Sequence, residues 1–119
     1  MMVSNASDHQ ITSYHRILTL DEMRTCLAEG FPFVFGFSVY QNFFDSSGNQ
    51  EVVTPMPSGQ QIGGHAVVAV GYDDSTQRFE IRNSWGTGQG DGGYFYMPYS
   101  YVTHPGLASD FWTIRTIER

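Results

Sequence analysis

Two residues of this sequence, His65 and Asn83, have side chains that together could perform acid–base chemistry. His65 follows the glycine pair 63–64, and Asn83 opens the sequence Asn-Ser-Trp-Gly at 83–86. A histidine is an effective general base only when its ring is held in one tautomer and orientation. An amide oxygen can hold the ring without adding a charge, which suits an imidazolium paired with a thiolate. The two residues therefore indicate the base side of a Cys-His-Asn catalytic group.

Two neighbouring strands are expected to bring these side chains together. The apolar, β-branched run at 65–72 is too short for a typical helix and is bounded by glycine, which predicts a buried strand. We expect His65 at the mouth of this strand, where the bare glycine backbone lets another group approach. After a polar turn at 73–77, residues 79–83 alternate apolar and polar and predict a second strand. Trp85 is expected to cover the His–Asn contact and keep water away from it.

The N-terminal part of the chain predicts a strand, a helix and a further strand. The strand is expected at His15–Leu18, reached through Ile11 and Tyr14. Thr19 and Glu22 have the spacing of a capping box, and they begin a helix that Gly30 and Pro32 end. The strongly apolar residues 33–40 predict a strand, and Gly36 within it implies that another group approaches its face closely.

The remaining segments complete an antiparallel α+β fold. Residues 41–59 are polar and predict a long surface loop, a kind of segment that is often functional. Strands are expected at 94–97 and 110–117, and a glycine-rich loop at 86–93. One clear helix and five or six strands joined mostly by short turns favour a half-open β-barrel or sheet. We expect one domain over residues 11–119, preceded by a flexible segment at 1–10.

Composition excludes several classes of partner. The 119 residues carry a net charge of −6 with only 6 Lys and Arg, which argues against nucleic acid or an anionic membrane as a partner. No stretch approaches the roughly 20 apolar residues of a membrane span. The start, Met1 to Asn5, lacks the pattern of a signal peptide. The compartment is left open: the chain is intracellular, or it is secreted and its true N-terminus is missing.

The sequence resembles the C-terminal, barrel-like half of a papain-like cysteine peptidase of the bacterial type. The resemblance covers roughly residues 14–117 and is carried by segments in the family's order, at 27–34, 64–72, 81–88, 91–94 and 108–112. Either the His motif or the Asn-Ser-Trp-Gly motif alone would be a moderate signal of this family, and the two together in this order are a specific one.

The resemblance implies a role for each of these residues. His65 would be the general base and acid of peptide-bond hydrolysis, and Asn83 would orient it. Trp85 would shield the pair, with Ser84 as a structural neighbour. The pocket for the substrate's second residue would be lined by Gly36, Gly64 and Ala66. No metal or other cofactor is implied.

Two departures from the family pattern affect the expected activity. The second tryptophan that the family has in its glycine-rich loop is replaced by Gln89, which puts the leaving-group side of the cleft in doubt. The family's nucleophilic cysteine, which opens a helix in an N-terminal domain after a glutamine, has no counterpart here. The sequence thus resembles half an enzyme with an incomplete active site.

Simpler roles compete with the catalytic ones at several positions. Cys26, the one cysteine, adjoins the apolar helix face formed by Leu20, Met23 and Leu27 and is expected to be a buried small hydrophobe. The other histidines have no metal-ligand spacing. The glycine-rich loop has no Lys-Ser/Thr partner and no following helix, so a tight connection is favoured over a phosphate site.

Three functions are therefore considered. The first is a cysteine peptidase whose thiolate comes from outside this chain, with a peptide or protein as substrate. The second is a non-catalytic module derived from such a peptidase, which binds a peptide or a partner. Both predict an exposed apolar wall and pairing with an N-terminal helical half or with a second copy. A transglutaminase-like enzyme is a third reading, disfavoured because Asn stands where that class more often has Asp.

Overall fold

The computed structural model describes residues 10–83 and 93–118, and it describes side chains within 14–83 and 93–113. This part of the chain contains six strands of a single sheet, one main helix and two short helices. In chain order they are β1 (Gln10–Arg16), α1 (Leu20–Ala28), β2 (Phe33–Tyr40), the 3-10 helix η1 (Gln41–Phe43), β3 (Gln61–Asp73), β4 (Arg78–Arg82), β5 (Tyr94–Pro98), α2 (Tyr99–Val102) and β6 (Ala108–Glu118).

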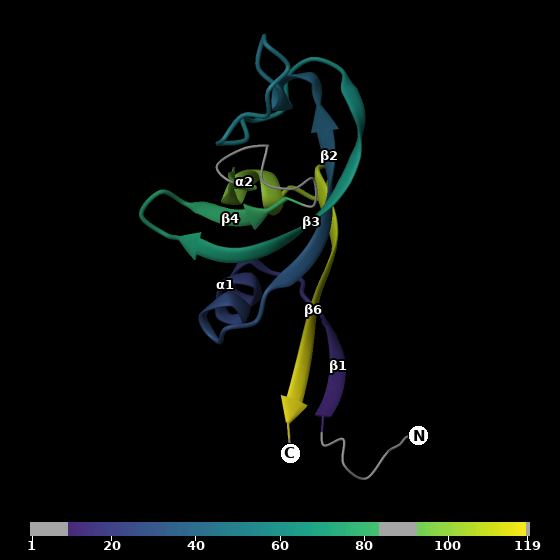
Figure 1. The fold of residues 1–119 in the computed structure, drawn as a ribbon, viewed down its shortest axis with the longest axis vertical. Coiled ribbons are helices and arrows are strands. Elements are labelled where there is room, and N and C mark those ends of the chain that lie inside the picture. The colour runs from purple at the N-terminus through teal and green to yellow at the C-terminus, as the bar shows by residue number, and fades with distance from the viewer. Residues whose placement is uncertain (1–9, 84–92, 119) are drawn as a thin grey trace.

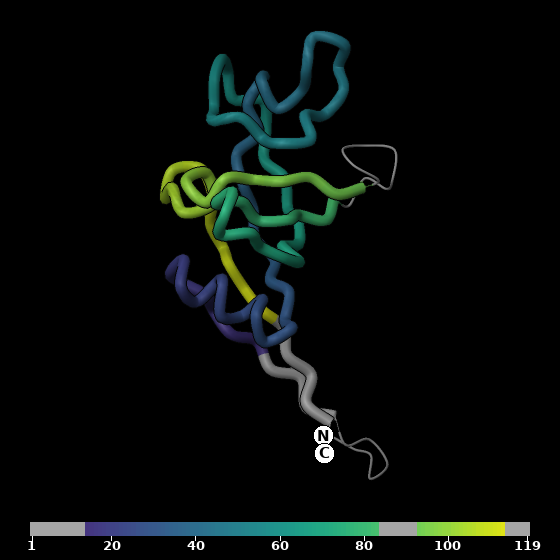
Figure 2. Tube along the Cα trace, turned by 90° about the vertical axis from the view of Figure 1, so that its left-hand side faces the viewer, coloured from purple at the N-terminus to yellow at the C-terminus, as the bar shows by residue number. Residues whose placement is uncertain are grey.

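The sheet is antiparallel throughout, with the strand order β1-β6-β2-β3-β4-β5. The last strand, β6, lies between β1 and β2. It forms with β1 an arm that extends away from the β3–β4 hairpin (Figure 1). The arm and the long connection between β2 and β3 lie at opposite ends of the molecule in Figure 1, and Figure 2 shows α1 on the side away from that connection. The predicted α+β class, with an open antiparallel sheet and one clear helix, is confirmed.

The start of α1 is fixed by the predicted capping box. Thr19 Oγ1 accepts a hydrogen bond from the Glu22 backbone N–H at 3.1 Å, and Glu22 Oε1 accepts one from the Thr19 N–H at 3.0 Å. The helix ends at Ala28, and Gly30 follows with a φ of 91°, a conformation that favours glycine. Local sequence therefore determines both ends of this helix.

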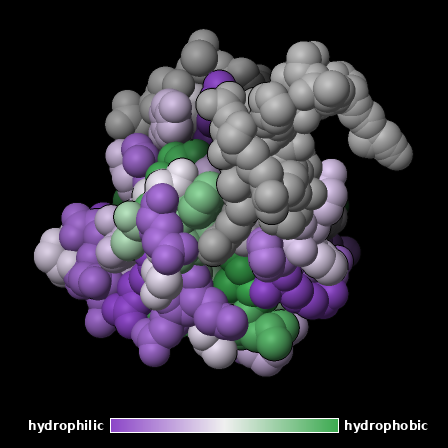
Figure 3. Space-filling model, turned by 90° about the horizontal axis from the view of Figure 1, so that it is seen from below, coloured by the Kyte–Doolittle hydropathy of each residue, from purple (hydrophilic) through white to green (hydrophobic). Residues whose placement is uncertain are grey.

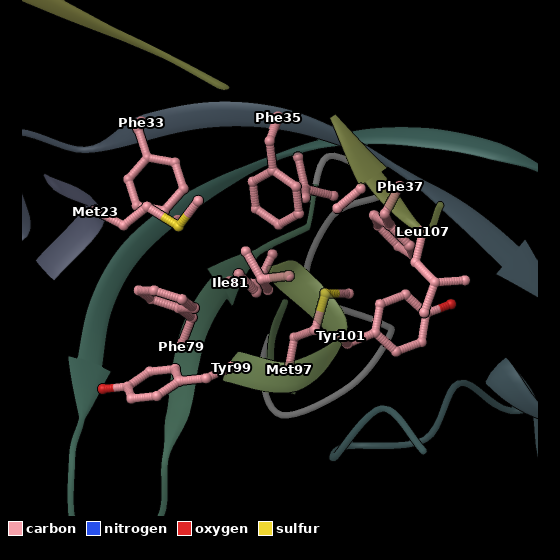
Figure 4. Packing of buried hydrophobic residues seen from close by; sticks show 14 of the residues in the cluster. Met23, Phe33, Phe35, Phe37, Phe79, Ile81, Met97, Tyr99, Tyr101 and Leu107 are labelled. Atoms are coloured by element: carbon pink, nitrogen blue, oxygen red, sulfur yellow. The ribbon is translucent and has the colours of Figure 1, made fainter. Parts of the chain in front are cut away.

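An aromatic core fills the inner side of the curved sheet. Alternate residues of β2 point inward, and they pack against side chains of β4, β5 and both α-helices (Figure 4). The Phe33 ring meets the Phe79 ring edge-on at 5.7 Å, and the Phe37 ring meets Phe95 at 6.3 Å. Burial of such large side chains is the main stabilising contribution of this face of the sheet.

Polar contacts attach the two α-helices to the sheet. Tyr99 donates a hydrogen bond to Asp74 at 2.7 Å, and Arg24 of α1 donates to the same carboxylate at 3.2 Å. The hydrogen bond from Tyr99, followed by that from Arg24, lowers the pKa of Asp74. In α2, Tyr101 donates to the backbone carbonyl of Ser38 at 2.6 Å, and burial raises the pKa of Tyr101 to about 12.

The strand that carries His65 begins earlier than predicted. β3 starts at Gln61, and its glycines pair with β2, as Gly63 faces Val39 and Gly64 faces Ser38. The prediction that His65 stands at the mouth of its strand is wrong, because backbone pairing needs no side chain and the glycines extend the ladder. His65 lies within β3, opposite Phe37.

Two other predicted segments differ in extent. The N-terminal strand is Gln10–Arg16, so His15–Leu18 is only partly strand. Leu18 leaves the strand because its N–H donates to Glu22 Oε1 at 2.8 Å, as part of the approach to the helix. Between the strands predicted at 94–97 and 110–117 the structure contains α2, whose single turn buries Tyr101 and is too short to show a helical period.

Candidate active site

His65 and Asn83 meet on the inner side of the sheet. His65 Nε2 lies 3.2 Å from Asn83 Oδ1, which is hydrogen-bonding distance. The two residues come from adjacent antiparallel elements, since His65 lies in β3 and Asn83 directly follows β4. Asn83 is buried, with 6% of its surface exposed, and His65 is half-buried. The predicted juxtaposition of the two side chains is thus present.

The geometry of this contact selects one histidine tautomer. Asn83 Oδ1 is an acceptor, so the neutral His65 ring that fits it carries its proton on Nε2 and its basic lone pair on Nδ1. The Phe37 ring packs against the imidazole in an edge-on arrangement, with centroids 5.9 Å apart. One neighbour thus orients the ring by a hydrogen bond and the other by packing, and neither adds a charge.

The three residues predicted to bind substrate line a single pocket on the outer side of the sheet. Gly36, Gly64 and Ala66 border a hollow of about 430 Å³ together with His65 and the segment 105–109. A Cβ built at Gly36 would lie 3.9 Å from the carbonyl oxygen of His65, an ordinary contact. Glycine at position 36 is therefore not required by packing within this chain, and its effect is to keep the pocket open.

Ser84, Trp85 and Gln89 lie outside the described residues. The predicted cover of the His–Asn contact by Trp85, the supporting place of Ser84, and the effect of Gln89 on the cleft stay predictions.

A residue that the sequence did not single out, Gln50, also contacts the side chain of Asn83. Gln50 Oε1 accepts a hydrogen bond from Asn83 Nδ2 at 2.6 Å, and Gln50 is itself buried. The interpretation of residues 41–59 as a surface loop is wrong for this part, since Phe43 and Thr54 are buried too. A polar residue in a polar segment gives no signal of burial. The apolar Phe43-Phe44 pair was the available sign that the segment folds inward.

Cys26 has the role predicted for it. It is 2% exposed in α1, and its thiol lies 3.1 Å from the backbone carbonyl oxygen of Phe31. It does not line the pocket that contains His65. Within the part of the chain that the structure describes, the one thiol is therefore a packing group, and it is not positioned as a nucleophile.

Two features are absent from the described ranges. No group of three or more His, Cys, Asp and Glu side chains there could hold a metal ion. No helix in the same ranges is long and apolar enough to cross a membrane.

A histidine oriented by a neutral amide is the arrangement of the base side in cysteine-type hydrolases. The family model described as "Papain family cysteine protease" matches residues 2–113. The chain belongs to the papain family of cysteine proteases. The predicted family and the predicted resemblance to its C-terminal fold are confirmed.

Relatives of this chain come from a virus, a bacterium and a plant. It is 43% identical over 100 residues to an uncharacterized peptidase C1-like protein L477 of Acanthamoeba polyphaga mimivirus, covering 82% of this chain and 32% of that protein. It is 47% identical to xylellain, a cysteine protease from Xylella fastidiosa, with a TM-score of 0.80 over 89% of this chain and 40% of xylellain. A Carica candamarcensis cysteine protease, 23% identical, shares the fold with a TM-score of 0.60 over 89% of this chain and 48% of that chain. The chain thus spans less than half the length of these relatives.

Proposed function

We propose that this chain supplies the histidine–asparagine side of a cysteine peptidase active site, and that the thiolate comes from residues outside 1–119. The contact between His65 Nε2 and Asn83 Oδ1 at 3.2 Å carries this proposal. Membership of the papain family supports it, and so does the buried position of Cys26, which points to a thiol from elsewhere.

In the proposed reaction His65 moves one proton at Nδ1. It takes the proton from the thiol, and the resulting thiolate attacks the carbonyl carbon of the peptide bond. The imidazolium then gives the proton to the leaving amine, and the acyl group stays on the sulfur. A water molecule hydrolyses this thioester while Nδ1 accepts the water's proton, and the proton returns to the departing thiol. Asn83 holds Nε2–H throughout, so the ring keeps its orientation.

The pocket bordered by Gly36, Gly64 and Ala66 would receive the side chain of the second substrate residue. The side chains that line it, from Phe37 to Ser109, carry no ionisable group except His65. A substrate with an uncharged, apolar second residue therefore fits it best, because a charged group would be desolvated there without an opposite charge.

The outer face of the sheet is the proposed contact surface for the cysteine-bearing part. Val34, Val68 and Val70 border a largely apolar hollow of about 480 Å³ there. Arg82 and Asn83 also line this hollow, and it shares Ala66 with the substrate pocket. Among the coloured residues in Figure 3 polar ones predominate, with smaller apolar patches between them. An apolar face that adjoins the site favours a partner that completes the site. Self-association through this face is the competing outcome.

A chimera with a relative tests the proposal. Residues 1–119 would replace the matching part of xylellain, which is 47% identical, so that xylellain supplies the remaining residues. We expect hydrolysis of fluorogenic peptides that is abolished by His65→Ala and reduced by Asn83→Ala. His15→Ala is the matched control, since His15 lies in β1 and does not border the pocket.

A folded chimera that binds peptide but hydrolyses none would overturn the catalytic proposal. That result would favour the second function, a peptide-binding module. The residues of this chain that line the pocket at Gly36 include no thiol, so a peptide could bind there without the nucleophile.

A further inference from the structure

The side chain of Gln50 is buried beside the His65–Asn83 pair, although it belongs to the long connection between β2 and β3. It is 5% exposed, and its Oε1 accepts the hydrogen bond from Asn83 Nδ2 at 2.6 Å. We propose that Gln50 is a positioning residue that fixes the Asn83 carboxamide in the orientation that His65 requires. This inference rests on the function proposed above for the pair.

The Asn83 carboxamide can face His65 in two ways. With Oδ1 toward the ring it accepts from Nε2–H, and the lone pair is on Nδ1. Rotated by half a turn, it would present its NH2 group to Nε2 and favour the tautomer with the proton on Nδ1. That tautomer could not accept a proton at Nδ1, so a rotated amide would remove the base.

Gln50 distinguishes the two orientations of the amide. Its Oε1 accepts from the Asn83 NH2 group in the observed orientation, whereas a rotated Asn83 would place two acceptor oxygens against each other. Both residues are buried, so the preference is not weakened by competing solvent. The hydrogen bonds run in one direction, from His65 to Asn83 and from Asn83 to Gln50.

The fold of the backbone around Gln50 places its side chain in the interior, beside Asn83. The Asp45 carboxylate accepts hydrogen bonds from the N–H groups of Ser47 at 2.8 Å and Asn49 at 3.0 Å, which closes a tight turn. Gln50 then forms a β-bridge with Phe44, while the neighbouring Phe43 is buried in the core against Phe95. The position of Gln50 is thus fixed by the turn on one side and by aromatic packing on the other.

Gln50 satisfies one buried donor and leaves another unsatisfied. Its Oε1 accepts from Asn83 Nδ2, while Gln50 Nε2 is buried and has no hydrogen-bond acceptor among the described residues. Methionine has nearly the same shape and would remove the unsatisfied Nε2, but it would also take the acceptor away from Asn83 Nδ2, and the loss of that partner costs stability. A purely structural role therefore predicts that Gln50→Met changes stability and leaves the tautomer of His65 unchanged.

The tautomer of His65 is the direct readout, and it can be measured on the 119-residue chain without peptidase activity. The nitrogen shifts of 15N-labelled histidine side chains report which ring nitrogen carries the proton in the neutral ring. In the unsubstituted chain we expect His65 as the Nε2–H tautomer. In Gln50→Met the ratio of Nε2–H to Nδ1–H should fall about fivefold or more, the change expected from loss of one hydrogen bond.

Two variants control this measurement. Gln50→Glu keeps an acceptor for Asn83 Nδ2 and should preserve the Nε2–H tautomer. Gln41→Met removes a side chain from the same connection whose Oε1 accepts from Gln60 N–H at 3.2 Å and which no observed hydrogen bond links to Asn83. It should leave the His65 tautomer unchanged.

A folded Gln50→Met chain with an unchanged tautomer ratio would overturn the inference. If Gln50→Met does not fold, the inference is tested on the Asn83 NH2 group of the unsubstituted chain. Slow rotation and slow exchange of the Asn83 NH2 group would support the hydrogen bond to Gln50, and a freely rotating group would overturn it. An inactive xylellain chimera with the expected tautomers would count against the peptidase function only.

Discussion

Filling the pocket at Gly36 should change substrate preference without unfolding the chain. The Cβ of a new side chain would lie 3.9 Å from the His65 carbonyl oxygen and 4.0 Å from that of Ser109, so the backbone need not move. The rest of a leucine side chain would extend into the hollow of about 430 Å³. Gly36→Leu should therefore exclude a bulky second residue of the substrate.

The size of the effect follows from the burial that the substrate loses. Burying a leucine side chain contributes about 1.5–3 kcal/mol. At about 1.4 kcal/mol per factor of ten, Gly36→Leu should lower kcat/KM about 10- to 100-fold for a peptide with leucine as its second residue. A peptide with glycine there loses no such burial, and its kcat/KM should change little.

The assay compares these two peptides on the xylellain chimera. Gly63→Leu is the matched control, because a Cβ at Gly63 meets no atom of the described residues within 4 Å and Gly63 does not border the pocket. An equal loss for both peptides would refute the reasoning, since it would indicate damage to the catalytic pair rather than a filled pocket. No loss for either peptide would show that the substrate binds elsewhere.

Three further results are expected. Val68→Asp should leave the melting temperature of the isolated chain nearly unchanged but prevent its assembly with a cysteine-bearing half in sedimentation, because Val68 is only half-buried on the outer face. Tyr101→Phe should cost about 1 kcal/mol in denaturant unfolding at pH 7 through loss of the bond to the Ser38 carbonyl. The pKa of Tyr101 is raised to about 12 in the folded chain, so its stabilising contribution is complete below pH 10 and is progressively lost above it. The difference in unfolding free energy between the unsubstituted chain and Tyr101→Phe should therefore be smaller at pH 11 than at pH 7. A difference that stays constant would contradict this. Cys26 should resist alkylation until the chain unfolds, and fast alkylation of the native chain would contradict its burial against the Phe31 carbonyl.

Local signals in the sequence were sufficient for the elements that frame the site. The capping box at Thr19 located the start of α1, and the apolar run at 33–40 matched β2 at both ends. The pairing of His65 with Asn83 could be predicted from the sequence alone, because a short polar turn between two strands makes those strands antiparallel neighbours. The chemistry of a histidine ring and an amide oxygen then predicted that the contact between His65 and Asn83 would be a hydrogen bond.

Features that depend on distant segments could not be predicted in this way. No local pattern shows that β6 lies between β1 and β2, because periodicity describes which face of a strand is buried and not which strand is its neighbour. Gln50 was missed for the same reason, since the partner of its side chain, Asn83, is remote in sequence. The start of β3 was missed because glycine weakens the strand pattern while its backbone still pairs.

The place of β6 in the sheet has a consequence for biosynthesis. While the chain is being made, β1 has no partner and β2 has an open edge, because β6, the strand that joins them, follows both in the sequence and leaves the ribosome after them. Closure of the sheet depends on contacts of long sequence separation, which slow folding. Chains that stop before Ala108 would keep two unpaired strand edges, and exposed edges of this kind promote aggregation. A prematurely terminated chain would therefore be prone to aggregate and would have to be removed by cellular quality control.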